Sequence, residues 1–150
     1  MPGSMVSEQT MASRELVSSR LLNWQLQSLP QDQREPSRYA MVNYQKSVPG
    51  KNYFALRRDH VKPAFDLALK EGKVAGWGLW STTFPAGAGM PYNWVSADFY
   101  NKMSEIGQYG FTDVMERANP KENMDELMPK MGESRAMVKR ELWQLIDYVR

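Results

Sequence analysis

Hydrophobic and polar residues alternate along several stretches of the chain, and such alternation predicts β-strands. In residues 38–48, RYAMVNYQKSV, the alternation would place Tyr39 and Met41 on one face and Val42 and Tyr44 on the other. Further strands are expected over residues 73–84, 92–100 and 141–149.

A helical spacing of hydrophobic residues predicts a long amphipathic helix over residues 52–72. Pro63 should kink or divide this helix, because its ring displaces the carbonyl four residues earlier and it has no N–H to donate. Residues 123–140 predict a second helical region, in two pieces that are broken around Pro129 and Gly132.

The order of elements from residue 38 onward is β-α-β-β-α-β, which is the split βαβ or ferredoxin-like pattern. It predicts an α+β fold in which a four-stranded antiparallel sheet carries its helices on one face. A short helix should start within residues 101–110, and residues 111–123 should be irregular. We interpret residues 1–37 as an N-terminal extension and linker, and residues 38–150 as the domain.

Residues 11–29 fit more than one structure. Their first half suits a helix, whereas Leu22, Trp24 and Leu26 alternate as they would in a strand. The linker after them, PQDQREPS at residues 30–37, carries two prolines and several charges.

A short internal echo offers a second interpretation of the same residues. ASRELV at 12–17 resembles ESRAMV at 133–138, and the tripeptide WQL follows in both places. The match is either a coincidence or the trace of a duplicated repeat, in which residues 11–29 copy the last helix and strand of the domain. The repeat hypothesis predicts a helix and then a strand, with Trp24 facing as Trp143 does.

The predicted central strands are poor in charge on both faces. A sheet with helices on one side and water on the other should have one polar face. The second face is therefore expected to lie against another sheet, and a homodimer is the simplest way to supply it. The expected faces are Val74, Gly76, Gly78 and Trp80 opposite Ala75, Trp77 and Leu79, and Tyr92, Trp94, Ser96 and Asp98 opposite Asn93, Val95, Ala97 and Phe99.

Composition narrows the possible functions. The chain has 150 residues, of which 42% are hydrophobic and 24% charged, as in an ordinary globular domain. A net charge of only +2 argues against nucleic-acid or membrane-surface partners, and we interpret the basic pairs Arg57-Arg58 and Lys139-Arg140 as solvated faces. With no cysteine and one histidine, the chain has no disulfide, thiolate nucleophile or two-histidine site.

The sequence leaves the compartment open. No hydrophobic run approaches the roughly 18 residues that a membrane span needs. The start MPGSM resembles a cloning remnant, so the protein is expected to be either cytoplasmic or exported with its leader removed.

Residues 38–149 carry a family resemblance. A strand ending in K-x-x-PGK is followed by a helix with KP in its second half, then by GWGLW and an aromatic strand. These features, with the end SRAMVKRELWQLID, resemble small uncharacterised bacterial members of the dimeric α/β-barrel superfamily. The resemblance implies ferredoxin-like subunits that pair sheet to sheet. That superfamily includes cofactor-free monooxygenases, haem-degrading and chlorite-decomposing enzymes and lactone isomerases, so the fold selects no reaction.

The glycine-rich stretch AGAGMP at residues 86–91 is not a phosphate-binding loop. Such a loop needs a Gly-Lys-Ser/Thr ending and a following helix, whereas here no lysine follows and the next element is a strand. Gly76 and Gly78 are more informative, because glycine inside a strand marks the close approach of another group. Either a packed neighbour or a ligand cavity would explain them.

Three residues are candidates for acid–base chemistry. His60 is either a surface histidine or a base that faces a pocket between helix and sheet. Asp98 lies in mid-strand, where a carboxylate should be paired or have a raised pKa, and it would either form a structural ion pair or act with His60. Tyr44 is a possible helper. The aromatic residues are interpreted first as core packing and second as the wall of a ligand pocket. The residues predicted to line such a pocket are Gly76, Gly78, Trp77, Trp80, Trp94 and Tyr92.

The sequence therefore supports two main hypotheses of function. In the first, the protein binds or converts a small apolar or aromatic molecule without a cofactor, with His60 as base and Asp98 or Tyr44 as helper. In the second, it is a non-catalytic dimeric protein whose sheet serves only for association. Haem binding through His60 is a less favoured third hypothesis.

Overall fold

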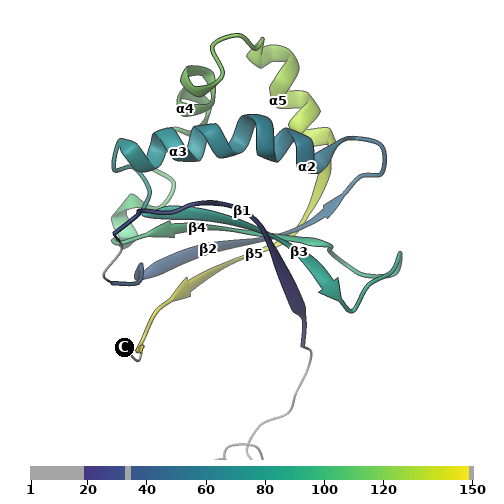
Figure 1. Ribbon diagram of the computed structural model, residues 1–150, viewed down its shortest axis with the longest axis horizontal. Helices are drawn as coiled ribbons and strands as arrows, with labels where there is room; N and C mark the ends of the chain where they lie inside the picture. The colour runs from purple at the N-terminus through teal and green to yellow at the C-terminus, as the bar shows by residue number, and fades with distance from the viewer. Residues whose placement is uncertain (1–18, 33–34, 149–150) are drawn as a thin grey trace, which may run out of the picture.

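The computed structural model describes residues 19–32 and 35–148, and it consists of one antiparallel sheet with helices on one of its two faces (Figure 1). The strands lie in the order β1-β3-β4-β2-β5. We call the face toward the helices the helix-side face and the other the open face. The strands are β1 (Leu21–Ser28), β2 (Tyr39–Ser47), β3 (Gly76–Phe84), β4 (Trp94–Tyr100) and β5 (Arg135–Gln144).

The fold is α+β, as the sequence predicts, but the sheet has five strands rather than four. The order β3-β4-β2-β5 is compatible with the ferredoxin-like pattern. The additional strand, β1, comes from the predicted N-terminal extension and pairs with β3, with Trp24 opposite Trp80. Without β1, the nine-residue strand β3 would be an unpaired edge of the sheet, and such an edge leaves backbone hydrogen-bonding groups without partners.

A register shift in β1 changes the faces that were expected for it. The shift lies between Trp24 and Leu26. Trp24 contacts Trp80 on the open face, with ring centroids 5.5 Å apart, whereas Leu26 packs into the core under the helices. The prediction that Leu22, Trp24 and Leu26 share a face is therefore wrong, because a bulge reverses the alternation at that point.

The positions of Trp24 and Trp143 test the predicted repeat only in part. Trp143 lies opposite Ala40 of the open-face cluster, so Trp24 and Trp143 are on the same face of the sheet. Residues 11–18 lie outside the described residues. The duplication therefore stays a prediction.

The long helix consists of three segments that follow one another without a break (Figure 1). These are α2 (Tyr53–Leu56), the π-helical turn η1 (Arg57–Val61) and α3 (Lys62–Lys70). The Lys62 N–H bonds to the Arg57 carbonyl five residues earlier, which widens the turn just before Pro63. Such a turn gives the proline ring the space that a regular α-helix would deny it.

The second half of the helical layer differs from its prediction. Residues expected to be irregular form α4 (Phe111–Ala118), which follows the short 3-10 turn η2 (Met103–Glu105). Helix α5 (Met124–Glu133) is unbroken, although it contains Pro129. Pro129 is exposed, so water can reach the backbone carbonyl that it leaves without a partner. Strand β5 begins at Arg135 rather than at residue 141.

Two hydrophobic clusters lie on opposite faces of the sheet. The helix-side cluster contains Trp77 and Leu79, and the open-face cluster contains Val42 and Val95, in agreement with the predicted alternation. Tyr92 is an exception, because it precedes β4 and packs on Tyr44 of the open face at 4.8 Å between ring centroids.

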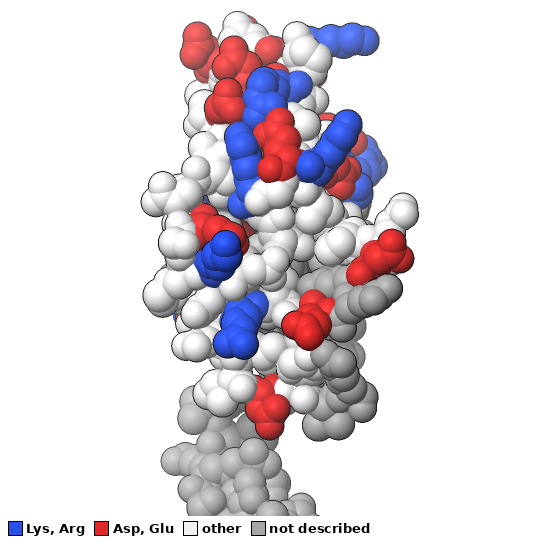
Figure 2. Space-filling view, turned by 90° about the vertical axis from the view of Figure 1, so that its left-hand side faces the viewer, with Lys and Arg blue, Asp and Glu red and all other residues white. Residues whose placement is uncertain are grey.

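Charged residues of both signs cover the outside of the helical layer. Figure 2 shows lysines and arginines interspersed with acidic residues over the upper part of the molecule, where the helices lie. In this layer Arg117 of α4 pairs with Glu71 after α3 and with Asp113 at 3.0 Å, and Lys73 pairs with Glu71 at 3.2 Å. Among the described residues, no helix has the length and hydrophobicity needed to cross a membrane.

Candidate functional site: an arginine-rich cavity

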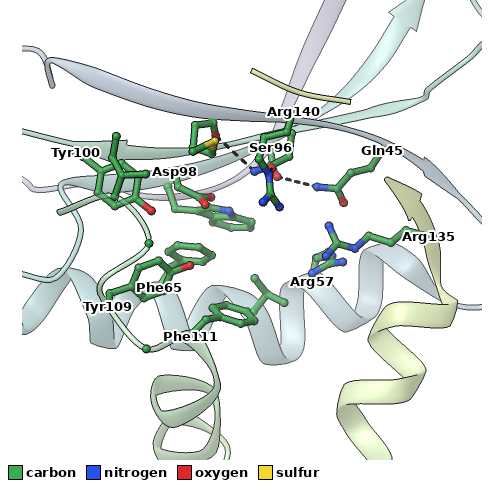
Figure 3. Close-up of a pocket in the computed structure, with 17 residues that line it drawn as sticks. Gln45, Arg57, Phe65, Ser96, Asp98, Tyr100, Tyr109, Phe111, Arg135 and Arg140 are labelled. Atoms are coloured by element: carbon green, nitrogen blue, oxygen red, sulfur yellow. Dashed lines mark hydrogen bonds between the residues drawn. The ribbon is translucent and has the colours of Figure 1, made fainter. Parts of the chain in front are cut away.

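A cavity of about 340 Å³ lies between the helix-side face of the sheet and the helices (Figure 3). Strands β2 to β5, the turn η1, helix α3 and the segment before α4 all contribute side chains to its wall. We call it the central cavity. Its ionisable lining residues are Arg57, Arg135, Arg140, Asp98, Tyr100 and Tyr109.

Aromatic rings form the apolar part of the wall. Phe65 of α3 stacks on Trp77 of β3, with ring centroids 5.0 Å apart and an angle of 7° between the planes. The rings of Tyr109 and Phe111 each lie 6.0 Å from Phe65. The flat surfaces of these rings suit a flat hydrophobic ligand.

Arg57 is the first residue of the π-turn, and it points into the cavity from the helical layer (Figure 3). Only 6% of its surface is exposed. Its guanidinium carbon lies 4.9 Å from the centre of the Tyr53 ring. In the described part of the chain, Nε and Nη2 have no hydrogen-bond acceptor, and burial lowers the pKa of the group. A buried cation with unused donors is a costly arrangement unless an anion joins it.

Two arginines of β5 bring more positive charge to the same cavity. Arg135 is the first residue of the strand, and burial together with the nearby Arg57 charge lowers its pKa to about 10. Arg140 donates from Nε to the Asn43 side-chain oxygen at 2.6 Å. The register explains this contact, because Arg140 and Asn43 are paired across β5 and β2.

Among the described residues, Asp98 is the one carboxyl group of the wall. It lies in β4 at the centre of the sheet, with Met41 of β2 and Trp77 of β3 as its cross-strand partners. Burial raises the pKa of Asp98 to about 7, although Arg140, Arg135 and Arg57 act in the opposite direction. The described residues donate no hydrogen bond to this carboxyl group. The three arginines therefore do not supply Asp98 with a close partner.

Buried hydrogen bonds connect the polar side chains that lie beside Arg57. The Tyr53 hydroxyl donates to the Gln45 side-chain oxygen at 2.7 Å, and the Gln45 amide donates to the Ser96 hydroxyl at 2.9 Å. These bonds fix Gln45 and the Tyr53 ring on which Arg57 lies. The position of Arg57 is therefore set by residues of β2, β4 and α2 together.

The three predicted acid–base residues are not brought together. Asp98 lines the central cavity, but Tyr44 lies on the open face and donates its hydroxyl to Glu141 at 2.8 Å. His60 is not among the residues that line the cavity, and its Nδ1 lies 3.0 Å from the side-chain oxygen of Asn119. The expected pairing of His60 with Asp98 is therefore absent, because the π-turn directs His60 toward α4 instead of the sheet.

The predicted pocket residues also separate between the two faces. Trp77 lines the cavity, whereas Trp80 and Tyr92 belong to the open face, and Trp94 packs on Tyr53 and Phe54. A Cβ atom added at Gly78 would overlap the Trp80 ring, and one added at Gly76 would lie 2.8 Å from the Leu29 side chain. Close packing, rather than a ligand cavity, therefore explains both glycines.

Sequence reasoning missed Arg57 and Arg135 of this site, whereas Arg140 is exposed, as predicted for the pair Lys139-Arg140. Arg57 was grouped with Arg58 as part of a solvated face, yet only Arg58 is exposed and pairs with Asp59. The helical spacing could have distinguished buried Arg57 from exposed Arg58. Arg57 precedes Val61 by four residues and Phe65 by eight, so it lies on the same buried side of the helix as they do. Arg135 and Arg140 carry no comparable pattern.

No protein-family model matches the chain, and no curated protein is significantly similar to it in sequence. Within the described residues, no group of three or more histidine, aspartate or glutamate side chains is placed to hold a metal ion. The residues that line the cavity are therefore the basis for assigning its chemistry.

Proposed function

We propose that the protein binds a small aromatic carboxylate in the central cavity. The observation that carries the proposal is the Arg57 guanidinium, which is buried beside the cavity and has two nitrogens without an acceptor among the described residues. A carboxylate accepts two parallel hydrogen bonds from one guanidinium, so it fits these unused donors.

The charge of the wall supports an anionic ligand. Three arginines face one carboxyl group, and that group has a pKa of about 7. Because the arginines are charged and Asp98 is partly protonated, the described lining carries a net positive charge near neutrality. A bound anion would lower the electrostatic cost of holding Arg57 and Arg135 so close together.

The apolar wall supports an aromatic body for that ligand. The stacked pair Phe65 and Trp77, with Tyr109 and Phe111, provides ring surfaces on which a flat molecule can lie. The cavity volume of about 340 Å³ is near the lower limit for ligand pockets, which favours a molecule of one or two rings.

Calorimetric titration with trans-cinnamate tests the proposal. We expect saturable 1:1 binding by the wild type, and binding weaker by on the order of tenfold or more in Arg57→Met, because a buried charge-assisted contact is lost. Arg58→Met is the matched control, since Arg58 is the neighbouring arginine but is exposed and pairs with Asp59. Equal affinity in Arg57→Met and Arg58→Met, or no binding to the wild type, would contradict the proposal.

We also propose that a second copy of the chain covers the open face, as the resemblance to the dimeric α/β-barrel superfamily implies. The open-face cluster is hydrophobic, and Trp24 and Trp143 beside it are 50% and 54% exposed. Large exposed aromatic side chains on a sheet face are typical of an association surface.

Light scattering after gel filtration measures this association. We expect the wild type to be a dimer and Trp143→Glu to be a monomer. Ile146→Glu is the control, because Ile146 is 95% exposed but lies beyond the end of β5. A monomeric wild type at micromolar concentration would overturn the dimer.

A further inference from the structure

The central cavity has two chemically different ends (Figure 3). Arg57 and Arg135 lie together at one end, and the Asp98 carboxyl lies toward the other end, near Tyr100 and Tyr109. We infer that the ligand is a hydroxylated aromatic carboxylate, whose carboxylate binds Arg57 and whose hydroxyl donates a hydrogen bond to Asp98. This inference rests on the proposed function and adds the substrate class.

The surroundings of Asp98 favour a hydrogen-bond donor at that end. The described residues donate no hydrogen bond to the carboxyl group, although it lines the cavity from β4, at the centre of the sheet. Asp98 is half-buried, so its carboxyl is accessible from the cavity, and a ligand O–H is the kind of group that would donate to it once the ligand displaces water.

The other ionisable groups of the cavity do not replace that donor. Arg57 reaches the cavity from η1, and Arg135 and Arg140 reach it from β5, with Arg140 already bonded to Asn43. Burial raises the pKa values of Tyr100 and Tyr109, so both hydroxyls stay protonated near neutrality. The Asp98 end is therefore lined by neutral phenols and a carboxyl group, and Arg140 is the arginine that acts most strongly on that carboxyl.

The position of the aromatic wall connects the two ends. Phe65 and Phe111 lie between Arg57 and Tyr109 along the helical side of the cavity in Figure 3. A ring held on this wall would direct its carboxylate to one end and a substituent on its far side to the other. Recognition at both ends of one ring selects for a particular position of the hydroxyl group.

Matched ligand pairs test the inference by calorimetry at a pH of about 8. The probes are trans-cinnamate and its 3-hydroxy and 4-hydroxy derivatives. We expect at least one hydroxylated probe to bind the wild type on the order of tenfold more tightly than cinnamate, the size of one charge-assisted hydrogen bond. The gain should shrink in Asp98→Asn, which keeps a neutral acceptor, and vanish in Asp98→Leu, which has none.

Each outcome separates this inference from the proposed function. Tight binding of cinnamate with no gain for either hydroxyl derivative overturns the inference and leaves the proposed function standing. A gain that persists in Asp98→Leu also overturns it, because another residue then receives the hydroxyl. Failure of all three probes to bind the wild type overturns both. Because each gain is a ratio within one variant, Asp98→Asn alone decides the outcome should Asp98→Leu not fold.

Discussion

The guanidinium of Arg57 lies over the ring of Tyr53, 4.9 Å from its centre, while its Nε and Nη2 have no acceptor in the described part of the chain. The ring gives the cation a favourable electrostatic contact on one side. It does not satisfy the N–H groups that point elsewhere. Tyr53 thus holds the Arg57 side chain in position, while two of its hydrogen-bond donors stay unsatisfied beside the cavity.

Because these buried donors have no acceptor among the described residues, we predict that Arg57 lowers the stability of the unliganded protein. In Arg57→Met we expect the free energy of unfolding to rise by about 1–2 kcal/mol, because a hydrophobic side chain of similar length replaces a buried, partly unsatisfied charge. Urea denaturation without ligand measures the change. Arg58→Met, at an exposed ion pair, should change stability by less than about 0.5 kcal/mol. A loss of stability in Arg57→Met would contradict the prediction, because it would show that the Arg57 cation stabilises the folded state.

Asp98 should make the stability of the fold depend on pH. Its pKa is about 7 in the folded protein and near 4 when unfolded, so between these values only the folded state keeps the proton. Stability contributed by the protonated carboxyl is therefore present at low pH and is lost as the pH rises through about 7. Arg57, Arg135, Arg140, Tyr100 and Tyr109 face the same cavity, where a charged Asp98 raises the pKa values of Arg57, Arg135, Tyr100 and Tyr109.

Asp98→Asn isolates this effect, because asparagine has nearly the same shape and does not titrate. We expect the wild type to lose on the order of 3 kcal/mol of stability relative to Asp98→Asn between a pH of about 4.5 and about 8. Denaturation curves of both proteins at several pH values give the difference. A constant difference across that range would show that Asp98 is ionised throughout and has a normal pKa.

The fold could be predicted from sequence wherever alternation was strong and uninterrupted. The strands β2, β3 and β4 and the long helix with its irregularity at Pro63 follow from patterns of period two and 3.6. Helix α4 was missed, although Phe111, Val114, Met115 and Ala118 have helical spacing. The bulge in β1 has no such pattern, since register depends on the partner strand.

The site was less predictable than the fold, and the reason is physical. Asp98 was identified because a carboxylate in mid-strand conflicts with its surroundings, and that conflict is visible in the sequence. Arg135 and Arg140 could not be found in this way, because charged residues at the edge of a sheet are normally solvated. Only the three-dimensional arrangement of η1 and β5 brings these arginines to the wall of the cavity that Asp98 also lines.

Gly78 should be required for packing on the open face. In Gly78→Ala the added methyl carbon would overlap the Trp80 ring, which itself packs on Trp24. We expect a loss of about 1–3 kcal/mol and a change in tryptophan fluorescence, because the indole must move. Gly89→Ala is the control, since nothing lies within 4 Å of the added carbon. Equal stability of the two variants would show that Trp80 can shift without cost.

His60 should support the helical layer and not the cavity. Its Nδ1 lies 3.0 Å from the Asn119 side-chain oxygen, and Asn119 is buried at the end of α4. In His60→Ala we expect stability to fall by about 1 kcal/mol, because Asn119 loses a partner, while the affinity for cinnamate stays unchanged. His60→Gln can restore a hydrogen bond to Asn119 and should recover part of the stability. A selective loss of cinnamate affinity in His60→Ala would instead restore His60 as a residue of the binding site.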